Sequence, residues 1–257
     1  MTYKYNCLLV ESIGDGVVHV QLNRPKQLNA IDPEMWDEIE DVFGKLDDDP
    51  NCRVILLSGN GRAFTSGIDL KSFSTTLTDL MNREEDVARK GRQILRIAEK
   101  MQVLFTRIEK CCKPVITAIH GYCIVCKELL VGFTDDMGTL NRMPKIIGNH
   151  SWLREVAMTG RDFSAQEALD QGFVSRMFDS YDALIAAAKE TAKIIANNSP
   201  VAVQGTKIVL NYSRDHSVDD SLRYVAMWNM SQIQTDDLTE SAVAVMTKGP
   251  KPIYAKL

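Results

Sequence analysis

The sequence predicts an α/β fold, a layered sheet followed by a run of helices. Short apolar runs rich in β-forming residues alternate with helical patterns in the first half of the chain, as at 54–57 and 115–119. From Asp182 onward almost every segment has a helical pattern. The alternation indicates strands and helices packed in layers, and the change of pattern indicates a helical lobe at the end of the chain.

Length and composition limit the function classes. A chain of 257 residues can bury a large core, and 45% hydrophobic with 25% charged residues is ordinary for a soluble globular protein. A formal net charge of −4 offers no electrostatic footprint for nucleic acid or an anionic membrane. No apolar run approaches the ~20 residues of a membrane span. The N-terminal sequence MTYKYNCLLVES has neither a signal-peptide nor a transit-peptide pattern.

The first elements are a hairpin, a helix and a strand. Strands at 8–11 and 17–22 are joined by Gly14-Asp15-Gly16, a strong turn signal. Asp32 is expected to cap a helix with Pro33 in its first position. One face of that helix is apolar: Met35, Trp36, Ile39, Val42, Phe43 and Leu46. A buried strand at 54–57 follows.

The segment AFTSGIDL at 63–70 carries the first candidate site. Gly67 lets the backbone bend, and a helix can start just after it, so amides near 67–69 can point outward and bind an oxyanion. The alternative is an ordinary loop in which Asp69 caps a helix. The polar stretch 74–83 predicts a mobile loop or a short helix. A long helix at 84–109 follows, and we assign its apolar stripe to the core.

The centre of the chain runs from 113 to 138. A buried strand at 114–119 ends at His120-Gly121, where the chain can turn sharply. Two carboxylates follow, Glu128 and Asp136, eight residues apart. A catalytic role requires both acids to face one cavity; the alternative is that both are surface charges.

The second half is mostly helical. We expect helices at 149–157 and 164–172, a strand at 174–178, and then helices at 182–197, 201–212, 217–234 and 237–247. We place a boundary at Ser199-Pro200, which divides the chain into a core, 1–199, and a helical lobe, 200–257. Apolar residues on the surface of the lobe predict self-association.

Cysteines and histidines give no sign of a metal centre. Six cysteines without a secretory signal indicate reduced thiols. Cys123 and Cys126 form a CxxC, which can be redox-active or bind zinc, but no second pair completes a zinc site and we favour small buried residues. The four histidines have no ligand spacing, so we expect no metal.

Several segments carry a resemblance to a known family: LNRPKQLNAID at 22–32, VILLSGNGRAFTSGIDL at 54–70, KPVITAIHGYCI at 113–124, MGTLNRMPKIIGN at 137–149 and TGRDFSAQEALDQGFVSRMF at 159–178. They resemble the enoyl-CoA hydratase/isomerase, or crotonase, superfamily. Within it, SGIDL at 66–70, the stretch 199–231 and the Ala-Lys-Leu ending are most similar to the Δ3,5-Δ2,4-dienoyl-CoA isomerases. The resemblance covers nearly the whole chain.

The resemblance implies a fold, a substrate and a set of site residues. The fold is a spiral of ββα repeats followed by a helical lobe that forms homotrimers, which pair into homohexamers. The substrate is a fatty acyl-CoA, whose two double bonds move from 3,5 to 2,4 during β-oxidation, without a metal or a redox cofactor. The implied catalytic carboxylates are Glu128 and Asp136; the implied oxyanion and acyl-CoA loop is Ser66, Gly67, Ile68, Asp69 and Leu70, with the Ile68 amide as a donor.

The C-terminal Ala-Lys-Leu resembles the Ser-Lys-Leu address that a peroxisomal import receptor reads. We therefore expect a peroxisomal protein with an accessible tail. The mitochondrion is the other compartment that the family implies, although no transit pattern is visible.

One departure from the family concerns activity. Between Ile124 and Lys127 roughly twenty family residues are absent, enough for a strand–loop–helix segment. The family's second oxyanion donor and a third acid belong to the absent piece, so we expect a poor or inactive isomerase. Two alternatives stay open: an enoyl-CoA hydratase, which uses two glutamates where this chain has Asp136 as its second acid, and a non-catalytic assembly subunit.

Overall fold

A computed structural model describes residues 3–124 and 127–257, with the backbone but not the side chain of Glu128. Its main sheet has four strands in the order β1-β2-β3-β5. β1 and β2 are antiparallel, whereas β2, β3 and β5 run parallel. The strands are β1 (Leu8–Ser12), β2 (Val17–Leu22), β3 (Val54–Gly59) and β5 (Val115–Ala118). A smaller sheet pairs β4 (Ala63–Thr65) with β6 (Tyr122–Cys123).

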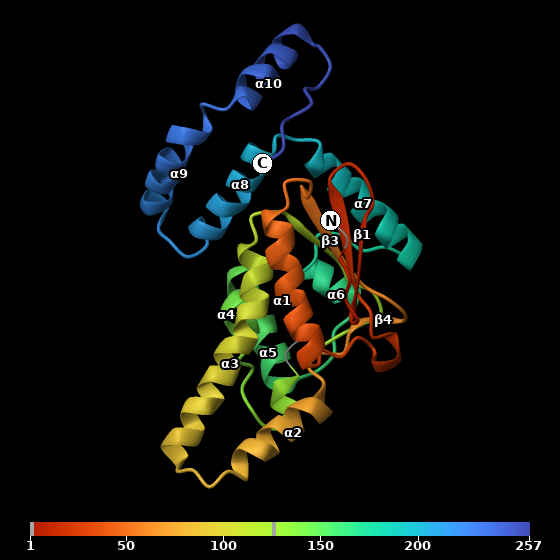
Figure 1. Cartoon of the computed structure of the whole chain (residues 1–257), viewed down its shortest axis with the longest axis vertical. Coiled ribbons are helices and arrows are strands. Elements are labelled where there is room, and N and C mark those ends of the chain that lie inside the picture. The colour runs from red at the N-terminus through yellow and green to blue at the C-terminus, as the bar shows by residue number, and fades with distance from the viewer. Residues whose placement is uncertain (1–2, 125–126) are drawn as a thin grey trace.

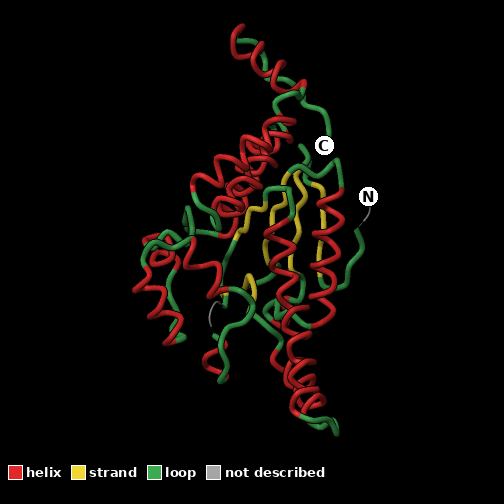
Figure 2. The backbone as a smooth tube through the Cα atoms, turned by 90° about the vertical axis from the view of Figure 1, so that its left-hand side faces the viewer, coloured by secondary structure: helices red, strands yellow, loops and turns green. Residues whose placement is uncertain are grey.

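Helices cover both faces of the main sheet, and Figure 2 shows the strands between them. The crossover helices α1 (Pro33–Asp48) and α3 (Val87–Lys110) pack on one face. α7 (Tyr181–Ala196) packs on the other, against β3, β5 and β2. Residues of β3 alternate between the two layers, Ile55 in the α1 core and Leu56 in the α7 core. The α/β prediction is therefore confirmed, with a sheet whose apolar runs are buried on both faces.

The predicted caps form, and the uncertain stretch is helical. Asp32 Oδ1 accepts a hydrogen bond of 2.9 Å from the Met35 N–H at the start of α1. The stretch 74–83 belongs mostly to α2 (Leu70–Met81), so it is a helix and not a loop. The first part of α3 extends with α2 beyond the sheet (Figure 1). The assignment of the whole α3 stripe to the core is accordingly wrong at Ile94, which is exposed.

The strand predicted at 174–178 is absent from the described part of the chain. An isolated extended segment needs a neighbour to satisfy its backbone hydrogen bonds. β5 is the last strand of its sheet, and the residues that the structure describes form no strand between β5 and this segment. The same lack of a neighbour leaves β5 less buried than its sequence predicts, with Thr117 exposed.

The remaining elements are a short 3-10 helix between β2 and α1 and several helices that follow β6. They are η1 (Pro25–Gln27), η2 (Glu128–Val131), α4 (Thr139–Arg142), η3 (Met143–Lys145), α5 (His150–Thr159), α6 (Ala165–Asp170), α8 (Pro200–Ser213), α9 (Val218–Gln232) and α10 (Asp236–Thr247). Figure 1 shows α8 to α10 extending away from the sheet. α8 touches the core through Lys207 Nζ, which donates to the Lys113 carbonyl at 2.9 Å. The boundary at Ser199-Pro200 stays a prediction.

No helix of the described chain combines the length and the apolar character needed to cross a membrane. The C-terminal tail lies against the core: Arg53 Nη2 donates to the carbonyl of Tyr254 at 2.6 Å, and the Tyr254 side chain is buried. The last three residues remain exposed.

Candidate functional site

The loop between β4 and α2 presents a backbone amide. Gly67 has φ +82°, a conformation that favours glycine, and turns the chain after Thr65. The Ile31 N–H donates to the Gly67 carbonyl at 2.8 Å, and the Asp69 N–H donates to the Ile31 carbonyl at 3.0 Å. Ile68 lies between these two bonds, and none of the described residues accepts a hydrogen bond from its N–H. This amide is free to bind an oxyanion.

Asp69 caps α2, as the alternative interpretation of this loop expects, while oxyanion binding by the loop stays a prediction. Its Oδ1 accepts from the Ser72 N–H at 3.2 Å, and Arg24 Nη1 pairs with its Oδ2 at 3.3 Å. Burial acts to raise the pKa of Asp69, but the hydrogen bonds from Ser72 and Arg24 outweigh it and lower that pKa. Arg24 also pairs with Asp32 at 3.0 Å, which joins the loop to the start of α1.

Asn29 is the buried support of the loop. Its side-chain amide donates to the carbonyls of Asn60 at 2.9 Å and Ala63 at 2.8 Å. The Thr65 hydroxyl in turn donates to the Asn29 carbonyl at 2.7 Å. Sequence reasoning did not assign a role to Arg24 or Asn29. Both residues lie in the segment 22–32, which contributes to the family resemblance, but the residue types in this segment do not point to a chemical role.

Ile124 lies against the same loop. Its N–H donates to the Thr65 carbonyl at 3.2 Å, and a Cβ added to Gly67 would lie 3.4 Å from Ile124 Cγ2. Residues 125–126, including Cys126 of the CxxC, lie outside the described residues. Burial raises the pKa of Cys123 to about 11, so its thiol is neutral at physiological pH.

Asp136 is the candidate acid whose surroundings are described. The residue is exposed, yet partial burial of its carboxylate, and then the negative charge of Asp135, raise its pKa above the ordinary value. Its carbonyl accepts a hydrogen bond of 2.7 Å from Gln102 Nε2 on α3. A raised pKa suits a carboxyl group that must both take up and release a proton near neutral pH.

Two contacts place the acid-bearing segment near the amide-bearing loop. Phe73, in the first turn of α2, stacks on Phe133 with ring centroids 5.8 Å apart. Met137 is buried in the main core, against which Ile68 and Cys123 also pack. The loop at 66–70 and the segment 133–137 therefore lie in the same region of the molecule.

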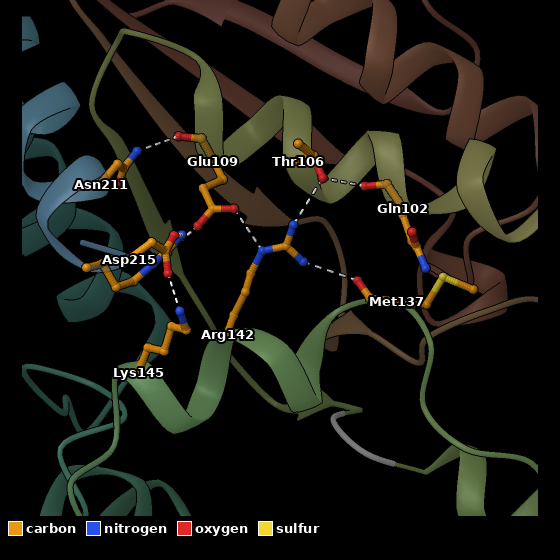
Figure 3. A network of polar contacts seen from close by, with 9 residues as sticks. Gln102, Thr106, Glu109, Met137, Arg142, Lys145, Asn211 and Asp215 are labelled. Atoms are coloured by element: carbon orange, nitrogen blue, oxygen red, sulfur yellow. Dashed lines mark hydrogen bonds and ion pairs between the residues drawn. The ribbon is translucent and has the colours of Figure 1, made fainter. Parts of the chain in front are cut away.

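A network of charged side chains fixes the segment after Asp136 (Figure 3). Arg142 donates from Nε to Glu109 at 2.8 Å, from Nη2 to the Thr106 hydroxyl at 3.0 Å, and from Nη1 to the Met137 carbonyl at 3.3 Å. Glu109 also pairs with Arg214 of the α8 cap. Burial acts to raise the pKa of Glu109, but hydrogen bonds from Arg142 and Arg214 outweigh it and lower that pKa. The sequence did not predict this network.

Glu128 lies in η2, and its side chain is outside the described part of the structure. That Glu128 and Asp136 face one cavity therefore stays a prediction. A cavity of about 460 Å³ lies between this region and α5; its walls include Leu129, Phe133, Asp135, Leu140, His150 and Arg154. Neither Ile68 nor Asp136 belongs to its walls.

Cys7, Glu34 and Glu38 form an acidic cluster in which one potential ligand atom from each lies within 4.8 Å of the others. The two Glu38 oxygens accept hydrogen bonds from the N–H groups of Asn6 at 2.7 Å and Cys7 at 2.8 Å. These bonds tie the N-terminal segment to α1. The expectation that the chain needs no metal stays a prediction.

Comparison with known proteins places this geometry in context. The family model "Enoyl-CoA hydratase/isomerase" matches residues 12–126 and 124–253. Rat mitochondrial Δ3,5-Δ2,4-dienoyl-CoA isomerase is 45% identical over 96% of this chain and 81% of its own length. The Arabidopsis thaliana peroxisomal Δ3,5-Δ2,4-dienoyl-CoA isomerase is 39% identical over 100% of this chain and 99% of its own. A crystal structure of enoyl-CoA hydratase from Bacillus anthracis superposes with a TM-score of 0.84, at 24% identity, over 97% of this chain and 99% of that one.

The alignment lengths reveal a gap. The Arabidopsis alignment spans 277 positions although the whole of this chain has 257 residues, which leaves about 20 positions without a counterpart here. The rat alignment spans 267 positions against 96% of this chain, about 247 residues, and leaves the same number. The two family-model matches meet at 124–126. That meeting point is where the sequence predicts a missing segment.

Proposed function

Because the chain belongs to the enoyl-CoA hydratase/isomerase family, we propose that it is a Δ3,5-Δ2,4-dienoyl-CoA isomerase whose turnover is lowered by a missing segment. The support for the isomerase is the identity to dienoyl-CoA isomerases over nearly the whole chain. The free amide of Ile68 is the observation in the site that carries the proposal.

The chemistry needs an anion site and groups that move protons. Removal of a proton from C2 of a 3,5-dienoyl thioester leaves a trienolate whose negative charge rests largely on the thioester oxygen. The Ile68 N–H would donate a hydrogen bond to that oxygen. Return of a proton at C6 gives the 2,4-dienoyl product, so the reaction consumes no net proton. Asp136, with its raised pKa, would move one of these protons, and Glu128 would serve as its partner.

The missing segment would remove the donor opposite Ile68. Loss of one oxyanion donor costs a factor of roughly 10²–10³ in rate. The N–H of Ile124 donates to the Thr65 carbonyl beside the loop, and the two family-model matches meet at 124–126, so a segment missing after Ile124 would belong to the site. We therefore expect acyl-CoA binding to survive better than turnover.

The test compares the natural chain with a variant that carries, between Ile124 and Lys127, the roughly 20 residues of the rat isomerase. The conversion of a 3,5-dienoyl-CoA is followed in both. We expect the inserted segment to raise turnover by about 10²–10³. Equal turnover would contradict the role given to the gap. Hydration of crotonyl-CoA by the natural chain, without isomerisation, would favour the hydratase alternative instead.

The surface of the helical lobe supports self-association. Large exposed apolar side chains lie on α8, on α9 and the residue that caps its C-terminus, and on α10: Leu210, Leu222, Met227, Met230, Ile233, Leu238, Val243 and Met246. We propose that this surface is covered in a homotrimer or homohexamer. Sedimentation of the natural chain and of Met230→Glu distinguishes the cases, because a buried glutamate would weaken the oligomer. A monomeric natural chain would instead favour assembly with an intact relative.

The Ala-Lys-Leu tail supports a peroxisomal location, which the Arabidopsis relative also has by its name; the rat relative is named as mitochondrial. Arg53 and the carbonyl of Tyr254 hold the chain just before the tail, and the last three residues are exposed. A receptor could therefore reach them without unfolding the core. Deletion of the three residues should abolish peroxisomal import of a tagged chain.

A further inference from the structure

The free edge of β5 carries unpaired backbone groups. In the parallel pairing with β3, Ile55 lies opposite Val115, and the Ile55 N–H donates to the Pro114 carbonyl at 2.9 Å. Backbone groups of a strand alternate in direction, so those of Val115 and Thr117 point away from β3. None of the described residues forms a hydrogen bond with them. Unpaired groups of this kind are a template for another strand.

A groove runs along this edge. One cavity of about 390 Å³ lies between β5 and the segment 173–178, and a second of about 350 Å³ continues it toward Gly121 and Cys123. We call it the β5 groove; its walls include Thr117, Ile119, Phe173, Val174, Phe178 and Leu184. The mostly apolar walls suit the side chains on one face of an extended segment.

The groove faces the segment that fails to form its predicted strand. Val174 to Phe178 has a strand-like sequence but forms no strand, and the groove separates it from β5. The relatives carry about 20 residues more than this chain, and the family match is interrupted at 124–126, just after β6. The strand β5 on one side of the groove and the strand-like segment 174–178 on the other are therefore compatible with one more strand between them.

We propose that the β5 groove binds an extended apolar segment of a second polypeptide, which pairs with β5 as an added strand. The roughly 20 residues that the dienoyl-CoA isomerases carry and this chain lacks provide the probe for such a segment. Binding itself does not depend on the proposed function. Restoration of turnover by the bound segment rests on that function.

The experiment uses the whole chain and a fluorescent synthetic peptide that copies those residues of the rat isomerase. Fluorescence anisotropy measures binding, and hydrogen exchange locates the amides that become protected. We expect saturable binding and slower exchange in the stretch 115–119. A peptide of scrambled sequence, and one N-methylated at alternate residues so that it cannot pair, serve as controls. Equal binding of either control, no saturable binding, or protection elsewhere would overturn the proposal.

A substitution in β5 tests the same hydrogen bonds by changing the protein instead of the peptide. Thr117→Pro removes an N–H that points away from β3, and we expect peptide affinity to fall by about tenfold or more. Thr117→Val keeps the N–H and should bind like the natural chain. If Thr117→Pro does not fold, the N-methylated peptide tests the same hydrogen bonds on the unaltered chain.

Turnover in the same samples separates the two proposals. Bound peptide together with a rise in isomerase turnover supports both. Bound peptide without turnover supports the strand-binding groove and counts against the proposed function.

Discussion

Gln102 on α3 donates a hydrogen bond of 2.7 Å from its side-chain amide to the backbone carbonyl of Asp136. A crossover helix of the main sheet thus holds the candidate acid by its backbone, and leaves its carboxylate free for chemistry. The position of Asp136 therefore depends on α3, which precedes the gap at 124–127, and on the Arg142 network, whose arginine follows it.

The charge of Asp135 should influence the pKa of Asp136. Its negative charge helps to raise the pKa of Asp136, after burial, so Asp135→Asn should lower that pKa. A base must be ionised to act, and turnover falls as the pH drops through its pKa. The acid limb of the pH profile of turnover should therefore move to lower pH in Asp135→Asn. An unchanged profile, or a shift to higher pH, would contradict the assignment. Asp79→Asn, an exposed substitution on α2, is the control and should leave the profile in place.

Gly67 should be sensitive to a side chain because of its backbone. Gly67→Ala forces alanine into a left-handed conformation and should lower the free energy of unfolding by about 1–2 kcal/mol. The space for a Cβ is ordinary, so the cost comes from φ and not from a clash. Chemical denaturation measures it.

Gly91 is the matched control. It lies inside α3 with open space around a Cβ. Gly91→Ala should raise the free energy of unfolding by about 0.5–1 kcal/mol, because alanine is the better helix former. Two substitutions with the same sign would contradict this account of the loop.

Glu109 should stabilise the fold in a pH-dependent way. Its pKa in the folded state is lowered from an ordinary value of 4.5, so its contribution is present above that value and is lost as the pH falls through the lowered one. Glu109→Gln should therefore destabilise the chain at neutral pH and have a smaller effect in acid. Urea denaturation over this pH range tests it, with the exposed substitution Glu240→Gln as the control. A destabilisation that grows in acid would contradict the network of Figure 3.

Local signals account for most of the fold. The apolar run at 54–57 became β3, and Asp32 with Pro33 began α1, because buried strands and helix caps are set by neighbouring residues. The prediction of a strand at 174–178 was wrong for the opposite reason. A strand forms only with a partner, and whether a partner exists depends on residues far away in the sequence.

The candidate site shows the same contrast between local features and long-range contacts. The sequence of SGIDL left open whether amides near 67–69 point outward or Asp69 only caps a helix, and the structure shows the Asp69 cap beside an unpaired Ile68 amide. The supports were not predictable, because Arg24 reaches Asp69 across 45 residues, and Glu109 reaches Arg214 across 105. The residues themselves marked Glu128 and Asp136 as candidate acids, but the resemblance supplied their catalytic role, and their joint action stays a prediction.

The central claim is that Asp136 moves protons on an acyl-CoA held at the Ile68 amide. Solvent-deuterium incorporation into a 3,5-dienoyl-CoA measures this directly, and it detects proton transfer even when turnover is slow. The natural chain should exchange the substrate's protons faster than the uncatalysed rate, and Asp136→Asn should reduce that exchange by about 10²-fold or more. Equal exchange by the natural chain and Asp136→Asn, or none above the uncatalysed rate in either, would contradict it.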